Sequence, residues 1–267
     1  MSSATSTAEF GVIVPARYAS ARLPGKPLLD LGGKPMVVRV LENALRAGAA
    51  FALVATDDER IARAVRDAGG EAMLTSPEHR TGTDRLAEVA RRKQLDPELV
   101  VVNLQGDEPL LPAEFVHKVA GALLSDREAS LSTLATELRR REHLFDPNVV
   151  KVVTDRRGRA LYFTRAPIPW LRGEFAHGAE SRDGDGELPR GLFWRHVGLY
   201  AYRVSTLHQL SGADPAPCEN AESLEQLRAL FLGLSIQVER VHDLPEGGVD
   251  TEADAERVRR FYETPAC

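Results

Sequence analysis

The chain has 267 residues, of which 43% are hydrophobic and 27% are charged, so it can bury one large core and resembles neither a disordered nor a fibrous protein. Its net charge of −5 argues against general nucleic-acid binding, and its two cysteines, Cys218 and Cys267, cannot build a disulfide framework or a zinc site. No segment approaches the roughly 20 apolar residues of a membrane span, and residues 1–9 lack the apolar centre of a secretory signal, so we expect a disordered leader over 1–9 and a cytoplasmic protein.

The first predicted element is a short buried strand, Phe10–Val14, which runs directly into a basic loop. Prolines at 15, 24 and 27 and Gly25 restrict this loop, which limits the entropy lost when a ligand is clamped. Residues 17–39 carry one negative charge, Asp30, and five positive charges: Arg17, Arg22, Lys26, Lys34 and Arg39. Local positive charge in an acidic chain predicts an anionic ligand, and a triphosphate is the natural candidate. The alternative is a solvated charged loop.

The common phosphate-binding sequences are absent from this region. No GxGxxG sequence follows the first strand, and Gly25-Lys26 lacks the upstream glycine of a P-loop. A nicotinamide cofactor and a P-loop ATPase are therefore both disfavoured.

Strand and helix patterns then alternate as far as Pro112. A helix begins at Pro35 and ends at Gly48; strands follow over 51–55, 72–75 and 99–104, and helices over 59–68, 83–93 and from Pro112 onward. This alternation predicts an α/β fold with a mostly parallel sheet flanked by helices. Ligands bind such sheets beyond the carboxyl ends of the strands, where both the basic loop and Gln105-Gly106-Asp107 fall.

Two acidic residues on glycine-containing turns are candidate metal ligands. Asp107 follows a buried strand and Gly106, and Asp250 follows Gly247-Gly248-Val249. A carboxylate in such a place can hold Mg²⁺ against phosphate oxygens. Each also has a plainer interpretation as the cap of a helix that begins nearby.

The pattern changes after about residue 130. Strands are predicted without intervening helices over 130–137, 149–154, 160–164 and 197–202, with a hairpin turn at 155–158 and a solvated loop over 172–191. Helices over 221–232 and 252–262 and a strand over 235–241 complete the chain. We therefore expect a single domain over 10–267, in which 160–205 form an antiparallel insertion that covers the substrate or pairs with another subunit.

Seven ordered motifs resemble those of the 3-deoxy-manno-octulosonate cytidylyltransferases, also called CMP-Kdo synthetases. The motifs are PARYASARLPGKPL at 15–28, GGKPM at 32–36, VATDD at 54–58, HRTGTDR at 79–85, NLQGDEP at 103–109, ESLEQLR at 222–228 and GVDT at 248–251. The resemblance spans about 10–262 and implies a Rossmann-like nucleotidyltransferase fold. It also implies a cytoplasmic homodimer that makes CMP-Kdo and pyrophosphate from CTP and Kdo with Mg²⁺, for lipopolysaccharide biosynthesis. The longest departure from the family is the charged loop over 172–191.

The same resemblance assigns roles to individual residues. It implies a nucleotide site made of Ala16, Arg17, Ser20, Arg22, Lys26, Arg80, Thr81, Gly82 and Gln105. The sugar-acid pocket is implied to contain Gln105, Arg165, His196, Tyr200, Glu225 and Gln226. Asp107 and Asp250 are the implied magnesium ligands, and Arg22 and Lys26 join them as catalytic residues.

The residues of the implied sugar-acid pocket also have plainer structural interpretations. His196 and Tyr200 are an even number of residues apart, so a strand aims both at one face, where a histidine is more often a core residue. Leu224, Leu227, Phe231 and Leu234 form a core-facing helical stripe, which leaves Glu225 and Gln226 off it and exposed by default. The resemblance is what favours a binding role.

The implied reaction is an in-line attack by the 2-hydroxyl of Kdo on the α-phosphorus of CTP. Arg22 and Lys26 would stabilise the leaving pyrophosphate, and no side chain identifies itself as a general base. Activation of a related sugar acid, such as a sialic acid or the 8-amino relative of Kdo, is the nearest rival hypothesis. A silent nucleotide-sugar binding protein and an assembly scaffold are rivals of other classes.

Overall fold

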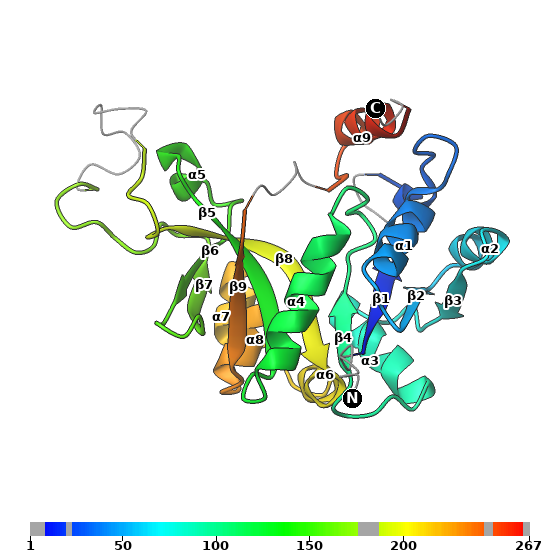
Figure 1. The fold of residues 1–267 in the computed structure, drawn as a ribbon, viewed down its shortest axis with the longest axis horizontal. Helices are drawn as coiled ribbons and strands as arrows, with labels where there is room; N and C mark the ends of the chain where they lie inside the picture. The colour runs from blue at the N-terminus through cyan, green and yellow to red at the C-terminus, as the bar shows by residue number, and fades with distance from the viewer. Residues whose placement is uncertain (1–8, 20–22, 176–186, 243–247, 264–267) are drawn as a thin grey trace, which may run out of the picture.

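The computed structural model describes residues 9–19, 23–175, 187–242 and 248–263, and its elements follow the predicted alternation closely (Figure 1). In chain order they are β1 (Phe10–Ala16), the 3₁₀ turn η1 (Lys26–Leu28), α1 (Met36–Arg46), β2 (Phe51–Thr56), α2 (Glu59–Asp67), β3 (Glu71–Leu74), α3 (Gly82–Arg92), β4 (Val100–Asn103), α4 (Ala113–Ser125), β5 (Leu131–Glu137), α5 (Arg141–Phe145), β6 (Lys151–Thr154), β7 (Ala160–Thr164), β8 (Trp194–Arg203), α6 (Val204–Ser211), α7 (Pro217–Glu222), α8 (Gln226–Phe231), β9 (Ile236–Val241) and α9 (Glu252–Glu263).

One mixed sheet organises the molecule, in the order β3-β2-β1-β4-β8-β5-β9. The pairs β1–β2, β2–β3 and β1–β4 are parallel, whereas β8 runs antiparallel to both β4 and β5. The chain leaves β1 for β2 on one side and returns to β4 on the other, so the strand order reverses between β1 and β4. A crevice for ligands opens beyond the carboxyl ends of strands at such a reversal. The fold prediction, an α/β Rossmann-like sheet with antiparallel strands in its second half, is confirmed.

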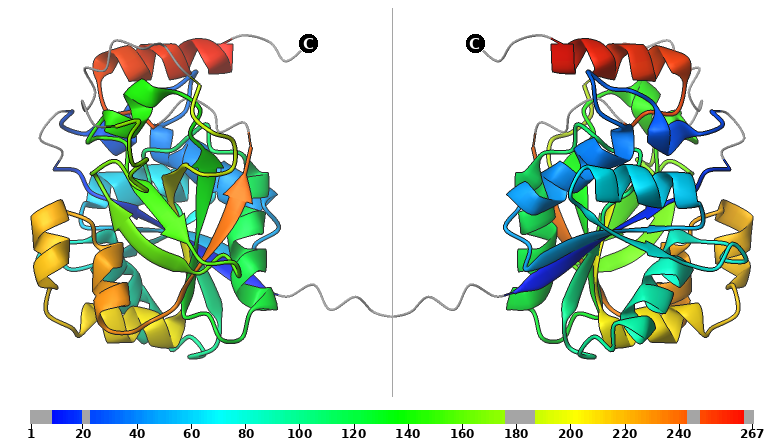
Figure 2. Two further views of the ribbon diagram at one scale, coloured as in Figure 1. Left: turned by 90° about the vertical axis from the view of Figure 1, so that its left-hand side faces the viewer. Right: turned by 90° about the vertical axis from the view of Figure 1, so that its right-hand side faces the viewer.

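The central strands are buried on both faces, which is why they are continuous apolar runs in the sequence. On β1, Val12 and Val14 belong to a core under α1, α2 and α4, whereas Ile13 belongs to a second core under α3, α6 and α8. Figure 2 shows this arrangement end-on, with α4 on one side of the sheet and α7 and α8 on the other. The packed sheet therefore holds the loops beyond β1 and β4 on a rigid base.

The second half departs from the predicted run of strands. Two helices were missed: α5, between β5 and β6, and α6, directly after β8. The predicted helix over 221–232 is wrong as one element, because Ser223 adopts a left-handed conformation with φ of +52° and separates α7 from α8. Its predicted apolar stripe is only partly correct, since Leu227 is buried but Phe231 is 65% exposed.

Helix α9 lies above α1 in Figure 1, on the side of the sheet to which the carboxyl ends of β1 and β4 point. Val249, Ala255 and Val258 pack against Leu31 and Met36 in a small separate core. This contact brings the turn before α9 next to the basic loop after β1. Among the described helices, none combines the length and the apolar character that a membrane crossing needs.

Candidate functional site

A cavity of about 350 Å³ lies at the crevice between β1 and β4. Its lining includes Ala16, Arg17, Lys26, Gln105 and Asp107 from the two loops. Gly106 is needed for this approach, because a Cβ atom there would lie 2.8 Å from the carbonyl oxygen of Pro15. Glycine thus lets the loop after β4 pack directly on the end of β1.

Lys26 joins the two predicted metal carboxylates. Its Nζ atom lies 2.7 Å from Asp107 Oδ2 and 3.1 Å from Asp250 Oδ1. Burial lowers the pKa of Lys26, but hydrogen bonds and charge from Asp107 and Asp250 outweigh burial and raise it. The ammonium therefore stays charged, and three residues from distant parts of the chain share one point at the cavity.

The alternative interpretation of Asp107 and Asp250 as helix caps is wrong. Helix α4 has Pro112 as its N-cap and no side-chain cap. At α9, Thr251 and Asp254 form a reciprocal pair, in which the Thr251 N–H donates to Asp254 Oδ2 at 2.9 Å and the Asp254 N–H donates to Thr251 Oγ1. Both helices begin without the two aspartates, whose carboxylates face Lys26 instead.

Glu108 is a third carboxyl group at this point. Burial raises its pKa to about 7, with further contributions from the charges of Asp107 and Asp250. A Cβ on Gly248 would lie 3.0 Å from Glu108 Oε1, so the carboxyl group packs on the turn before α9. The protein thus disfavours a third negative charge beside the two aspartates near neutral pH.

A second cavity of about 300 Å³ continues from the first, since Arg17, Gly82 and Gln105 line both. It adds two residues predicted for the nucleotide, Arg80 and Thr81. Arg17 Nη2 donates to the Arg80 carbonyl at 2.8 Å, which links the loop after β1 to the segment before α3. The described nucleotide residues therefore border one continuous space. Ser20 and Arg22 lie outside the described residues.

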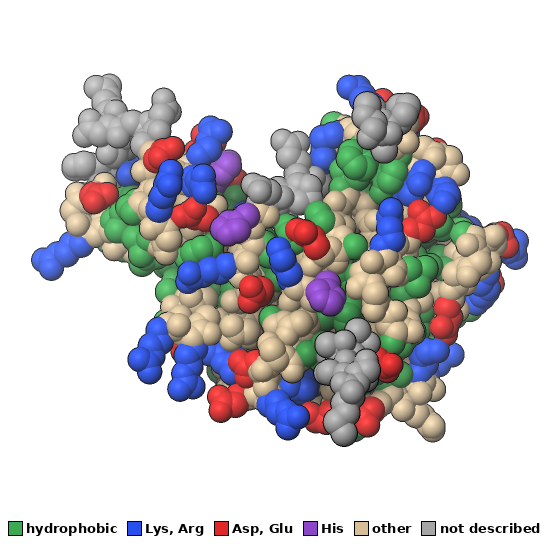
Figure 3. Space-filling model, viewed as in Figure 1, with side chains coloured by type: hydrophobic (Ala, Val, Ile, Leu, Met, Phe, Trp, Pro, Cys, Tyr) green, Lys and Arg blue, Asp and Glu red, His purple; other side chains and the backbone are tan. Residues whose placement is uncertain are grey.

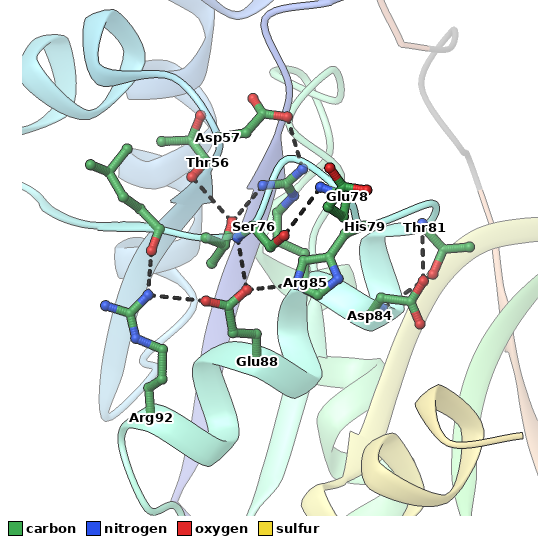
Figure 4. Close-up of polar contacts among 12 residues, drawn as sticks. Thr56, Asp57, Ser76, Glu78, His79, Thr81, Asp84, Arg85, Glu88 and Arg92 are labelled. Carbon is green, nitrogen blue, oxygen red and sulfur yellow. Dashed lines mark hydrogen bonds and ion pairs between the residues drawn. The ribbon is translucent and has the colours of Figure 1, made fainter.

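A buried arginine that the sequence analysis did not single out supports this end of the site (Figure 4). Arg85 lies on α3, is 1% exposed and lines the first cavity. Its guanidinium donates to Asp57 Oδ2 at 3.0 Å and to Thr75 Oγ1. Asp57 Oδ1 in turn accepts from the Tyr18 N–H at 3.4 Å. Arg85 belongs to the HRTGTDR motif and Asp57 to the VATDD motif, so these motifs could have identified both residues as part of the site.

A second network in Figure 4 holds the segment that carries Arg80 and Thr81. Glu88 Oε2 accepts from the Ser76 N–H at 2.8 Å and contacts His79 Nε2 at 2.6 Å. Burial raises the pKa of Glu88, but hydrogen bonds from Ser76, His79 and Arg92 outweigh it and lower the pKa. Helix α3 thus fixes the segment before it from two sides.

The predicted sugar residues are only partly brought together. Tyr200, Glu225 and Gln226 line the second cavity. Burial raises the pKa of Glu225, while hydrogen bonds from Thr83 and Thr81 lower it and tie this carboxyl group to the start of α3. The default of solvent exposure is wrong for Gln226, which is 7% exposed.

His196 and Arg165 stand apart from that group. The predicted common face of His196 and Tyr200 is confirmed, because their rings lie 5.4 Å apart. His196 Nε2 lies 2.9 Å from Thr133 Oγ1, and burial lowers its pKa to about 3, with Arg195 contributing. Arg165 donates to the carbonyls of Glu222 at 2.7 Å and Pro147 at 2.9 Å. Within the described chain neither is among the lining residues of the two cavities, and their sugar roles stay predictions.

Which donor set could hold a metal follows from this geometry. No group of three or more His, Cys, Asp or Glu side chains arranged for a metal occurs in the described parts of the chain. Two carboxylates alone suit Mg²⁺, which is commonly bound by one or two carboxylates together with substrate phosphates and water. Asp107 and Asp250 meet that description.

Comparison with known proteins finds similar sequences and structures over almost the whole chain. The cytidylyltransferase family model matches residues 11–236. A 3-deoxy-manno-octulosonate cytidylyltransferase of Halorhodospira halophila is 53% identical over 96% of this chain and 97% of its own. One of Methylococcus capsulatus is 52% identical over 95% and 96%. A solved CMP:2-keto-3-deoxy-manno-octonic acid synthetase complexed with CTP superposes with a TM-score of 0.84 at 39% identity, over 96% of this chain and 98% of that one.

Proposed function

The chain belongs to the 3-deoxy-manno-octulosonate cytidylyltransferase family, and from this premise we propose how its site carries out the reaction. The enzyme transfers the CMP group of CTP to 3-deoxy-D-manno-octulosonate (Kdo) and releases pyrophosphate. The single observation that carries this proposal is the convergence of Asp107 and Asp250 on Lys26 at the nucleotide cavity. A binding protein or a scaffold needs no such paired carboxylates.

The residues around the first cavity bind and orient the triphosphate. Arg17 and Lys26 supply positive charge there, and we assign Ser20 and Arg22 of the same loop to the phosphates from the family motif. Pyrophosphate leaves with increasing negative charge, which fixed cations stabilise more than water does, because they need no reorganisation. Arg80, Thr81 and Gly82 hold the nucleoside part beside the start of α3.

The two aspartates are the proposed ligands of Mg²⁺. When bound, the metal would supply charge neutralisation at the phosphates and make a coordinated hydroxyl easier to deprotonate. The protein's own part is to hold Asp107 and Asp250 within reach of one cation. Turnover with Mg²⁺, with Mn²⁺ and with excess chelator tests this assignment; full activity in chelator contradicts it.

The part of the second cavity that Tyr200, Glu225 and Gln226 line is the proposed sugar-acid site. Gln105 borders both cavities and so lies where the two substrates meet. Tyr200, Glu225 and Gln226 offer hydroxyl, carboxyl and amide groups that can hydrogen-bond the hydroxyls of Kdo. His196 is neutral near pH 7, because burial lowers its pKa to about 3, and its ring contacts that of Tyr200. We assign no general base.

Pyrophosphate release tests the proposed specificity. Each of CTP, UTP, ATP and GTP is supplied with and without Kdo, and we expect release with CTP and Kdo alone. The 8-amino relative of Kdo and a sialic acid are then compared with Kdo at equal concentration. Faster turnover of either compound would make that sugar acid the preferred substrate. Absence of pyrophosphate release with every acid would favour a binding protein.

We also assign a homodimer to this enzyme. Figure 3 shows hydrophobic side chains at the surface on the side of the molecule where β6 and β7 lie in Figure 1. Leu161 is 60% exposed, Trp170 53% and Leu192 39%. Exposed apolar groups gathered in one region are typical of a surface that another subunit covers. Sedimentation velocity of the wild type and of Trp170→Asp tests this assignment. We expect the wild type to be a dimer and Trp170→Asp to be a monomer. A monomeric wild type would contradict the assignment.

The expected setting is the bacterial cytoplasm, where CMP-Kdo supplies lipopolysaccharide biosynthesis. Depletion of the protein in its host should stop Kdo incorporation into lipopolysaccharide. Unchanged Kdo content after depletion would remove this assignment while leaving the reaction itself intact.

A further inference from the structure

The Lys26 ammonium lies between Asp107 and Asp250, where the proposed metal would bind. The ammonium lies within 3.1 Å of both carboxylates, and the Lys26 side chain is only 11% exposed. The aspartates keep more contact with solvent, at 39% and 51% exposure. A nearly buried cation is thus held between two half-exposed anions, where it offsets part of their negative charge.

The backbone keeps these carboxylates together. The Val249 N–H donates to the Asp107 carbonyl at 2.9 Å. A Cβ atom on Gly248 would lie 2.8 Å from the same carbonyl oxygen, so the two segments pack backbone against backbone. Asp107 and Asp250 therefore stay neighbours whichever cation lies between them, and some cation is needed there to offset two like charges.

Lys26 also belongs to the loop that holds the phosphates. It begins the turn η1, and the Lys26 N–H donates to the Leu23 carbonyl at 3.1 Å. Gly25 precedes it in a left-handed conformation, with φ of +73°. The four-carbon stem of lysine is flexible, so its ammonium can change partners without a change in this backbone. A phosphate group in the first cavity offers such a partner.

We infer that Lys26 is an exchangeable counter-ion that couples nucleotide binding to metal binding, an inference that rests on the proposed function. Without nucleotide, the ammonium offsets part of the charge of Asp107 and Asp250 and competes with a divalent cation for them. With nucleotide, the phosphates take the ammonium and leave the carboxylates to the metal. Nucleotide and metal therefore promote each other's binding, and by linkage the effect is equal in both directions.

The test is the affinity of the nucleotide-free enzyme for Mn²⁺, measured by electron paramagnetic resonance of free Mn²⁺. Removal of the internal cation takes a positive charge away from both carboxylates, so Lys26→Met should bind Mn²⁺ at least about 10-fold more tightly than the wild type. Lys26→Gln should show the same increase in Mn²⁺ affinity. Lys26→Arg keeps the charge, so its Mn²⁺ affinity should stay near that of the wild type. The double variant Lys26→Met with Asp107→Asn should lose the gain.

Lys34→Met is the matched control. Lys34 lies on the same basic segment, but its ammonium pairs with Glu42 at 2.5 Å. This variant removes the same charge outside the carboxylate pair, and its Mn²⁺ affinity should equal that of the wild type. An equal gain in Lys34→Met would reduce the effect to net charge and overturn the coupling.

Other results separate this inference from the proposed function. Equal or weaker Mn²⁺ binding in both Lys26→Met and Lys26→Gln overturns the counter-ion role, even if the wild type makes CMP-Kdo normally. Absence of pyrophosphate release from the wild type overturns the proposed function, whatever the Mn²⁺ affinities are. Thermal melting shows whether each variant is folded. If Lys26→Met does not fold, Lys26→Gln replaces it in the comparison.

Discussion

The nucleotide end and the sugar end of the site are built from different kinds of chain segment. At the nucleotide end, the residues follow strands β1 and β4 or precede α3, and the described ones border one continuous space. At the sugar end, the residues come from the position after β7, from β8 and from the junction of α7 and α8, and two of the five exclusive to it, Arg165 and His196, line neither cavity within the described chain. Sheet topology alone places the first group, whereas the second depends on how separate elements pack.

Asp107→Asn should have the largest effect and tests the nucleotide end most directly. Loss of this carboxylate removes half of the proposed metal-binding pair, so we expect turnover to fall by about 1000-fold with only a small change in CTP affinity. Steady-state kinetics and calorimetric titration with CTP check this. Asp254→Asn is the control, because that carboxylate caps α9 and should cost stability rather than turnover. Near-normal turnover would remove Asp107 from the metal site.

Arg85→Met tests whether buried support is needed at that same end. It leaves Asp57 and Thr75 without their partner, and breaking a buried ion pair commonly costs about 3 kcal/mol in the free energy of unfolding. We also expect weaker CTP binding, because Tyr18 is held through Asp57. Urea unfolding and CTP titration measure the two effects. Arg92→Met removes a half-exposed guanidinium from the same helix and should cost much less; equal losses would contradict the role of Arg85.

Glu108→Gln tests the electrostatics beside the two aspartates. The native carboxyl group has a pKa near 7 against an ordinary value of 4.5, so the native state binds more protons between these values. Wild-type stability should therefore fall as pH rises from about 4.5 to 7, by roughly 2 kcal/mol after allowance for partial exposure.

Glu108→Gln has no ionisable group at this position, so its stability lacks this dependence on pH. Urea unfolding should show equal stability of the two proteins near pH 4 and a more stable variant near pH 8. Glu114→Gln, at an exposed position on α4, is the control and should show no pH-dependent difference from the wild type. A difference between wild type and Glu108→Gln that does not change with pH would contradict the raised pKa.

Tyr200→Phe should have the smallest effect and tests the sugar end alone. Loss of one neutral hydrogen bond costs about 1 kcal/mol, so the KM for Kdo should rise about 5-fold. The KM for CTP is the internal control and should not change. An equal rise for both substrates would show that the two ends are not separate in function.

The sequence predicted the α/β architecture because its strands are buried on both faces and are continuous apolar runs. It did not predict the break between α7 and α8, since the helical pattern continues through Ser223 and only its left-handed backbone ends the helix. Helix α5 was missed because it has five residues, which is too short for a periodic pattern.

For the site, local sequence by itself identified the basic loop, the two aspartates and the edge of the sheet at which they lie. It could not decide between a metal ligand and a helix cap, because both interpretations place an acid before a helix. Tertiary structure excluded the cap interpretation by bringing Lys26 between Asp107 and Asp250 and by giving the caps to other residues, and the metal role stays a prediction. Contacts between distant segments depend on how whole elements pack, and that information is not contained in the spacing of any one motif.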